Sequence, residues 1–173
     1  ILFHNLKYYF MYKYSIRYGL AAGIIIGTIM VTAFYSGIPT RGNKYLTISN
    51  LIIMYLPSFL TIYSARKFNG GEILFKDALR IGISASILTS TVFTIFTATY
   101  YYLLNPNFAI KYLVDIEISL KQAGITGVEL KKQMAEWAAD MSPGNQTFKT
   151  FLSATILTSI IAAINALILC KKD

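Results

Sequence analysis

Four long apolar stretches alternate with shorter polar segments along the chain and make up about half of its 173 residues. They run over residues 16–35, 45–63, 78–103 and 148–169. Because about 20 residues of α-helix, rising about 1.5 Å each, match a hydrocarbon core about 30 Å thick, each stretch predicts a membrane-spanning helix. The predicted fold class is an all-α membrane protein, with four transmembrane helices in one domain over residues 1–173.

Segment 105–147, between the third and fourth stretches, begins with the pattern of an amphipathic helix. Residues 108–122 place four apolar side chains on one helical face and charged residues elsewhere. Gly124 is expected to end this helix. The four apolar residues are Ala109, Leu113, Ile116 and Leu120.

A second short helix is expected in the same segment. Thr126 to Glu129 matches a capping box, a common helix start, and Ser142-Pro143-Gly144 is expected to end the helix. We interpret the pair as an extracytoplasmic helical hairpin that lies on the membrane face or caps the bundle. The apolar side of the second helix is a candidate surface for a partner, and its residues are Leu130, Met134, Trp137 and Met141.

Charge is sparse, since 14% of the residues are charged against about 25% in soluble domains. The net charge is +8, but the basic residues flank the apolar stretches and form no single basic face, so we expect no nucleic-acid partner. Lys and Arg gather on the cytoplasmic side of membrane proteins. This rule predicts that both termini are cytoplasmic, with nine basic residues on that side: Lys7, Lys13, Arg17, Arg66, Lys67, Lys76, Arg80, Lys171 and Lys172.

The first apolar stretch carries a row of glycines, Gly19, Gly23 and Gly27, spaced four residues apart. Small residues at this spacing form one helix face and let another backbone approach closely in a membrane. Two interpretations follow: packing against another helix of the same chain, or docking of a second membrane protein. Further small or polar residues add to the candidate packing or partner face, namely Gly82, Ser86 and Asn165.

Asn69-Gly70-Gly71 predicts a turn between the second and third stretches. It lacks the Gly-Lys-Ser/Thr that follows in a nucleotide-binding loop. Bases beside such a turn extend toward the membrane surface and suit anionic lipid headgroups. The candidate headgroup contacts are Arg66, Lys67, Lys76 and Arg80.

Catalytic and metal-binding groups are scarce in this sequence. His4 is the only histidine, and Asp115 and Glu117 stand two apart on a helix, so they point in different directions. No His, Cys or carboxylate cluster has metal-ligand spacing. We therefore expect no catalysis, cofactor or metal. The one weak candidate for an enzyme acting on a lipid-linked substrate is Asp77 with Arg80.

Motifs along nearly the whole chain resemble one family of bacterial membrane proteins, domain of unknown function 4199, found mainly in Bacteroidota. The resemblance implies four transmembrane helices in the inner membrane and no assigned activity. Genes of that family often stand near those of lipid-linked sugar transferases, which implies a partner of that kind. The motifs are Lys13 to Gly19, Tyr63 to Arg66, Gly70 to Phe75, Ala78 to Gly82, Asn105 to Phe108 and Phe148 to Ala166.

These observations favour an accessory or structural subunit of a bacterial inner-membrane complex, without catalysis of its own. Its expected partners are membrane lipids and another membrane protein, in a hetero- or homo-oligomer. The alternative is a small transporter or lipid-handling protein, working with a lipid-linked sugar transferase. That alternative requires a polar cavity at the middle of the bilayer, lined by Asn50, Thr89 and Asn165.

Overall fold

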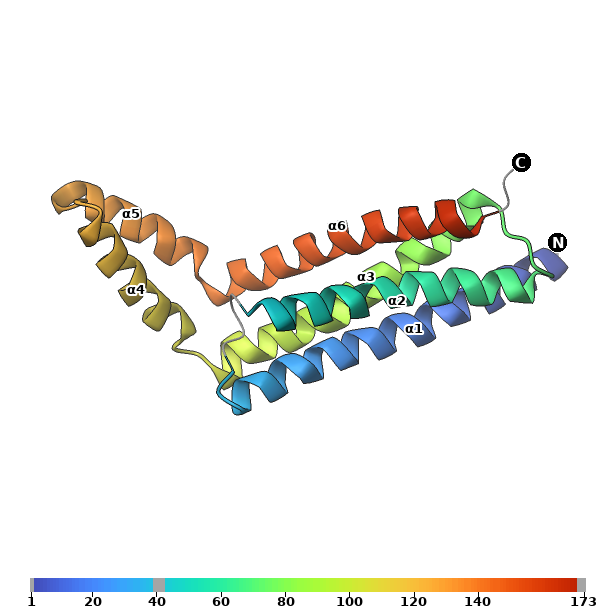
Figure 1. Ribbon diagram of the computed structural model, residues 1–173, viewed down its shortest axis with the longest axis horizontal. Helices are drawn as coiled ribbons and strands as arrows, with labels where there is room; N and C mark the ends of the chain where they lie inside the picture. Colours follow the sequence, from blue (N-terminus) through green and yellow to red (C-terminus); the bar gives the residue numbers. More distant parts are fainter. Residues whose placement is uncertain (1, 39–42, 171–173) are drawn as a thin grey trace. The chain divides into compact units, whose positions relative to one another are not determined.

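The computed structural model describes the backbone of residues 2–38 and 43–170, and within these ranges the side chains from Met11 onward. The described part of the chain is helical and contains no strand, which confirms the all-α prediction. The helices, shown in Figure 1, are α1 (Leu2–Tyr35), α2 (Lys44–Phe68), α3 (Phe75–Thr99), the π-helix η1 (Tyr100–Leu104), α4 (Phe108–Gln122), α5 (Gly127–Asp140) and α6 (Pro143–Leu169).

Four helical segments are long and apolar enough to cross a membrane, as predicted. The mean hydropathy of their most apolar windows lies between 1.5 and 2.1. These values indicate a membrane protein, in which helices satisfy their own backbone hydrogen bonds away from water. The segments are Met11–Tyr35, Lys44–Phe68, Phe75–Leu104 and Pro143–Leu169.

All four long helices begin earlier than predicted, α2 by one residue and α3 by three. Helix α1 begins at Leu2, well before residue 16, because no glycine or proline interrupts the aromatic and basic segment ahead of the apolar stretch. Of the basic residues expected on the cytoplasmic side, Lys7, Lys171 and Lys172 lie outside the described side chains. Helix α6 begins at Pro143, five residues earlier than the predicted residue 148.

The Ser142-Pro143-Gly144 motif ends α5 but also starts α6. The Ser142 hydroxyl accepts a hydrogen bond from the Asn145 N–H at 3.4 Å, as an N-cap residue does. Proline suits the first helical position because its missing N–H would have no partner there. At the start of α5, Thr126 is the N-cap residue but makes no side-chain cap hydrogen bond, so the predicted capping box is not formed.

The chain forms two compact units. Residues 1–93 and 151–173 make up the first, here called the bundle unit, and residues 94–150 make up the second, the hairpin unit. In the bundle unit, α1, α2 and the parts of α3 and α6 that belong to it lie side by side (Figure 1). One core cluster lies where α1 begins and α6 ends, and it contains Met11, Ile62, Ala65, Ile73, Ala78, Ile81, Ala166 and Leu169.

Gly19 and Gly23 of α1 face α3. A Cβ atom on Gly19 would lie 2.8 Å from the Ala85 carbonyl oxygen, and one on Gly23 would lie 2.6 Å from Val92 Cβ. Gly27 is also buried. Gly19 and Gly23 therefore let two helices of the same chain pack closely, which is the first of the two predicted interpretations.

Side-chain hydrogen bonds also join the helices of the bundle unit. Ser15 Oγ of α1 donates to the Ile81 carbonyl of α3 at 2.9 Å, and Thr89 Oγ1 of α3 donates to the Gly19 carbonyl at 3.2 Å. Ser86 Oγ of α3 donates to the Thr158 carbonyl of α6 at 2.9 Å. All three donors are buried, so these hydrogen bonds tie α1, α3 and α6 together at their interior.

In the hairpin unit, α4 and α5 pack against each other. The predicted face of α4 is half-buried: Ala109, Leu113, Ile116 and Leu120. Before α4, the Asn105 N–H reaches back five residues to the Tyr100 carbonyl at 2.8 Å, which makes the π-helix turn of η1. The Tyr101 and Phe108 rings lie 5.1 Å apart across this connection, so aromatic contacts hold the start of α4.

The close approach of α1 and α3 yields a first prediction. Gly23→Leu should lower the free energy of unfolding by about 1–3 kcal/mol, because a side chain there meets Val92 and the Thr89 carbonyl. Thr28→Leu on an exposed position of the same helix is the control and should have little effect. The measurement is the thermal unfolding midpoint in mild detergent; equal midpoints for the two variants would contradict the packing.

The hydrogen bond between α3 and α6 yields a second prediction. Ser86→Ala should destabilise the protein by about 0.5–1 kcal/mol, since it removes a hydrogen bond between membrane helices. Ser84→Ala is a matched control, because Ser84 Oγ donates only within its own helix, to the Arg80 carbonyl at 2.9 Å. Denaturation in mixed micelles measures both; a Ser84 variant as destabilised as the Ser86 variant would count against the interhelical bond.

Candidate functional site

The connection between α2 and α3 has a conformation that requires its two glycines. Gly70 and Gly71 have φ angles of 77° and 97°, which side chains rarely permit. The Gly71 N–H donates to the Arg66 carbonyl at 3.0 Å, and Arg66 Nε donates back to the Gly71 carbonyl at 2.6 Å. Arg66, one of the predicted headgroup contacts, thus closes this connection through its Nε atom.

The other three predicted headgroup contacts are exposed on α2 and α3: Lys67, Lys76 and Arg80. A further basic residue, Arg17 of α1, lies near them; the sequence pattern links it only to the membrane orientation. The Arg17 guanidinium lies 6.0 Å from the centre of the Tyr18 ring, within cation–π range, and the Tyr18 hydroxyl lies 3.2 Å from Ser64 Oγ of α2. The basic end of the bundle unit therefore includes α1, beside its contact with α2.

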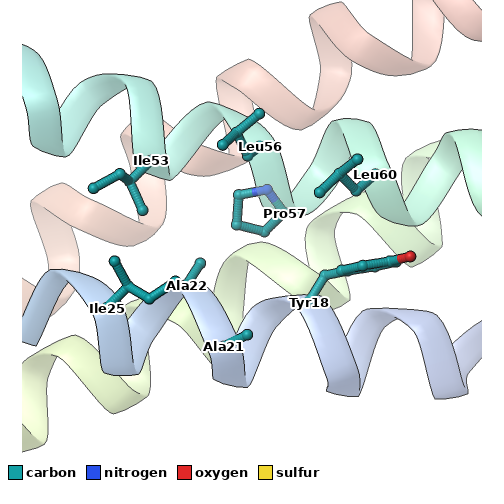
Figure 2. A pocket seen from close by; sticks show the side chains of 8 residues that line it. All are labelled: Tyr18, Ala21, Ala22, Ile25, Ile53, Leu56, Pro57 and Leu60. Carbon is teal, nitrogen blue, oxygen red and sulfur yellow. The ribbon is translucent and has the colours of Figure 1, made fainter.

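A small groove lies between α1 and α2, next to the contact of Tyr18 with Ser64. Its volume is about 110 Å³ and its walls are apolar apart from the Tyr18 hydroxyl. Figure 2 shows Pro57 of α2 facing Ala22 of α1 across it, with Tyr18 toward one end and Ile25 toward the other. The lining residues are Tyr18, Ala21, Ala22, Ile25, Ile53, Leu56, Pro57 and Leu60.

The groove follows from residue size and from the proline. Ala21 and Ala22 fill little space on α1, so the larger side chains beside them leave a hollow. Pro57 lines the opposite wall on α2, and a proline within a helix removes one backbone N–H from the helical hydrogen bonds. In hydrocarbon there is no hydrophobic force to squeeze such a gap shut. Two alanines and one proline within apolar helices give no distinct pattern, so the sequence did not predict this groove.

Two of the polar residues expected to line a cavity belong to different helix contacts. Thr89 donates to the Gly19 carbonyl of α1, whereas Asn165 Nδ2 donates to Ser58 Oγ of α2 at 2.8 Å. The third residue is Asn50, half-buried on α2. Thr89 and Asn165 therefore join separate helix pairs, α1 with α3 and α2 with α6.

The remaining predicted residues, Gly82 and Asp77, lie at positions that helix packing and the helix dipole account for. Gly82 faces Ile62 and Ala162, at 3.1 and 3.2 Å from the position of an added Cβ. Asp77 lies in the first turn of α3, where a negative charge is favourable to the helix dipole. Within the described ranges, no group of three or more His, Cys, Asp or Glu could hold a metal ion.

On the hairpin, the predicted contact residues are only partly accessible. Leu130 and Met134 are half-buried on α5, and Trp137 is 36% exposed. More apolar surface lies on α4, in a stripe that the sequence analysis did not identify: Ile110, Val114 and Ile118 are 62%, 51% and 50% exposed. The i, i+4 spacing of these residues could have revealed it, since such residues share a face.

Comparison with known proteins gives one match. Neither a curated protein nor a solved structure matches this chain. A family model described as "Protein of unknown function (DUF4199)" matches residues 17–171, which covers nearly the whole chain and confirms the resemblance found in its motifs. The protein therefore belongs to the family described as "Protein of unknown function (DUF4199)".

Proposed function

We propose that this protein is an accessory subunit of a bacterial inner-membrane complex, without catalysis of its own. Its contact with another membrane protein is made by the hairpin of α4 and α5, on the extracytoplasmic side. The observation that carries the proposal is the exposed stripe of Ile110, Val114 and Ile118 on α4. Apolar residues gathered on one exposed helix face mark surfaces that bind a partner.

The surroundings of this stripe support a protein partner. Lys111 and Asp115 are exposed beside it on α4, and Glu117 forms an ion pair with Lys121 at 2.6 Å on the stripe's own side of the helix. An apolar centre with a charged rim is typical of protein–protein interfaces. On the membrane helices, Gly19 and Gly23 already pack against α3 within the bundle unit.

The proposed orientation rests on charge. The start of α1, the α2–α3 connection and the end of α6 share one end of the bundle unit, where Met11, Ile73 and Leu169 pack together. Lys13, Arg17, Lys67, Lys76 and Arg80 are exposed at or near that end. By the positive-inside rule this end is cytoplasmic. The chain then crosses the membrane an odd number of times before the hairpin, so the hairpin is extracytoplasmic.

The single cysteine tests this orientation, as a third prediction. Cys170 follows α6 and is half-buried. In spheroplasts, a membrane-impermeant maleimide should leave Cys170 unlabelled until the inner membrane is opened. In a Cys170→Ser background, Ser119→Cys on exposed α4 should be labelled at once. The reverse pattern would place the hairpin in the cytoplasm.

The partner surface gives a fourth prediction. A photo-crosslinking residue at Ile110 of the full chain, activated in intact cells, should yield one discrete protein adduct. The same residue at Ser119, exposed on the opposite side of α4, should not. Val114→Lys should reduce the Ile110 adduct about tenfold, because a charge would be buried in the interface.

The control for that experiment is Ser119→Lys, which adds the same charge to the same helix and should leave the adduct unchanged. Identification of the adduct by mass spectrometry decides the outcome. A lipid adduct at Ile110 would mean that the stripe lies in the membrane interface, and the absence of any adduct would mean that it faces water. Either result would reject the proposed partner surface.

A further inference from the structure

The groove between α1 and α2 points toward the basic end of the bundle unit. On α2 its lining residues Pro57 and Leu60 continue along one helix face to Ser64 and Lys67, at i, i+3, i+7 and i+10. On α1, Arg17 stands one turn before the lining residue Ala21. The contact of the Tyr18 hydroxyl with Ser64 Oγ, 3.2 Å long, joins the helices between the groove and these two cations.

The groove is a suitable length for part of a hydrocarbon chain. Its lining spans Tyr18 to Ile25 on α1, roughly 10 Å at the rise of an α-helix. Its volume of about 110 Å³ is well below the roughly 300–1,000 Å³ of pockets that enclose whole ligands. An occupant therefore places only a segment in the groove and keeps the rest outside it.

The charges at one end decide between two such occupants. A helix from a second protein would present apolar side chains along the groove and has no use for cations beyond it. A phospholipid has an acyl chain with a phosphate at its end, so it matches apolar walls followed by exposed cations. Arg17 and Lys67 are both exposed, and bases at the membrane surface attract anionic headgroups.

We infer that this groove binds one acyl chain of an anionic phospholipid, whose phosphate contacts Arg17 and Lys67. The Tyr18 ring forms the boundary between the chain and the headgroup, as aromatic residues do at membrane interfaces. Ala21, Ala22 and Pro57 provide the space for the chain. This site is separate from the hairpin and does not depend on a protein partner.

The test is native mass spectrometry of the full chain in mild detergent, titrated with phosphatidylglycerol or with phosphatidylcholine of the same acyl chains. Phosphatidylglycerol should be retained in preference. Lys67→Gln and Arg17→Gln should each reduce that preference about fivefold, since each removes one cation from the headgroup. Lys13→Gln is the matched control, because it removes the same charge from an exposed position of α1 at the same end that does not line the groove.

A second pair of variants tests the chain. Ala21→Leu fills the groove and should lower retention of both lipids about tenfold. Thr28→Leu adds the same side chain at an exposed position of α1 that does not line the groove, and retention should be unchanged. Both proteins are first checked for helix content and for a single elution peak, and the surface variant Lys67→Gln decides the question if Ala21→Leu does not fold.

Three results would overturn the inference. Equal retention of the two lipids would remove the role of the phosphate. An equal loss for Lys13→Gln and Lys67→Gln would assign the preference to the overall positive charge of this end. Conversion of an oligomer to a monomer by Ala21→Leu, with lipid retention unchanged, would show that a helix of another chain occupies the groove.

Discussion

Hydrogen bonding in a hydrocarbon solvent is the constraint on which the bundle unit depends. Helices satisfy their own backbones there, but serine, threonine and asparagine side chains need partners inside the protein. Ser15, Ser86 and Thr89 meet this need by donating to carbonyls of neighbouring helices. The same bonds fix which helices are neighbours, because each hydroxyl reaches only a backbone in close contact.

Residue size decides where the helices touch and where they separate. Gly19 and Gly23 bring α1 so close to α3 that an added Cβ would overlap its atoms. On the side facing α2, the alanines of α1 meet a proline, and a groove remains. One helix thus packs tightly on one face and loosely on another. The proposed lipid site uses this loose face, where the packing of α1 and α2 leaves space for an acyl chain.

Apolar residues are distributed differently on the hairpin unit and on the membrane helices. Helix α4 has a half-buried apolar face and a second, exposed apolar stripe, with charged residues beside them. A helix in water that exposes such a stripe gains free energy when the stripe is covered. This is why the proposed function assigns the partner contact to α4, and not to the predicted α5 residues Leu130 and Met134.

Local pattern sufficed for the all-helical class, the four spans and the predicted face of α4, because length, hydropathy and helical periodicity are properties of consecutive residues. The candidate sites depended on contacts between residues far apart in the chain. Gly19 meets Ala85, Tyr18 meets Ser64, and Arg66 is engaged by a turn whose geometry needs Gly71. No periodicity reveals which helix a glycine row will face, so only the tertiary structure could turn the glycines into an internal contact and the alanines into a groove.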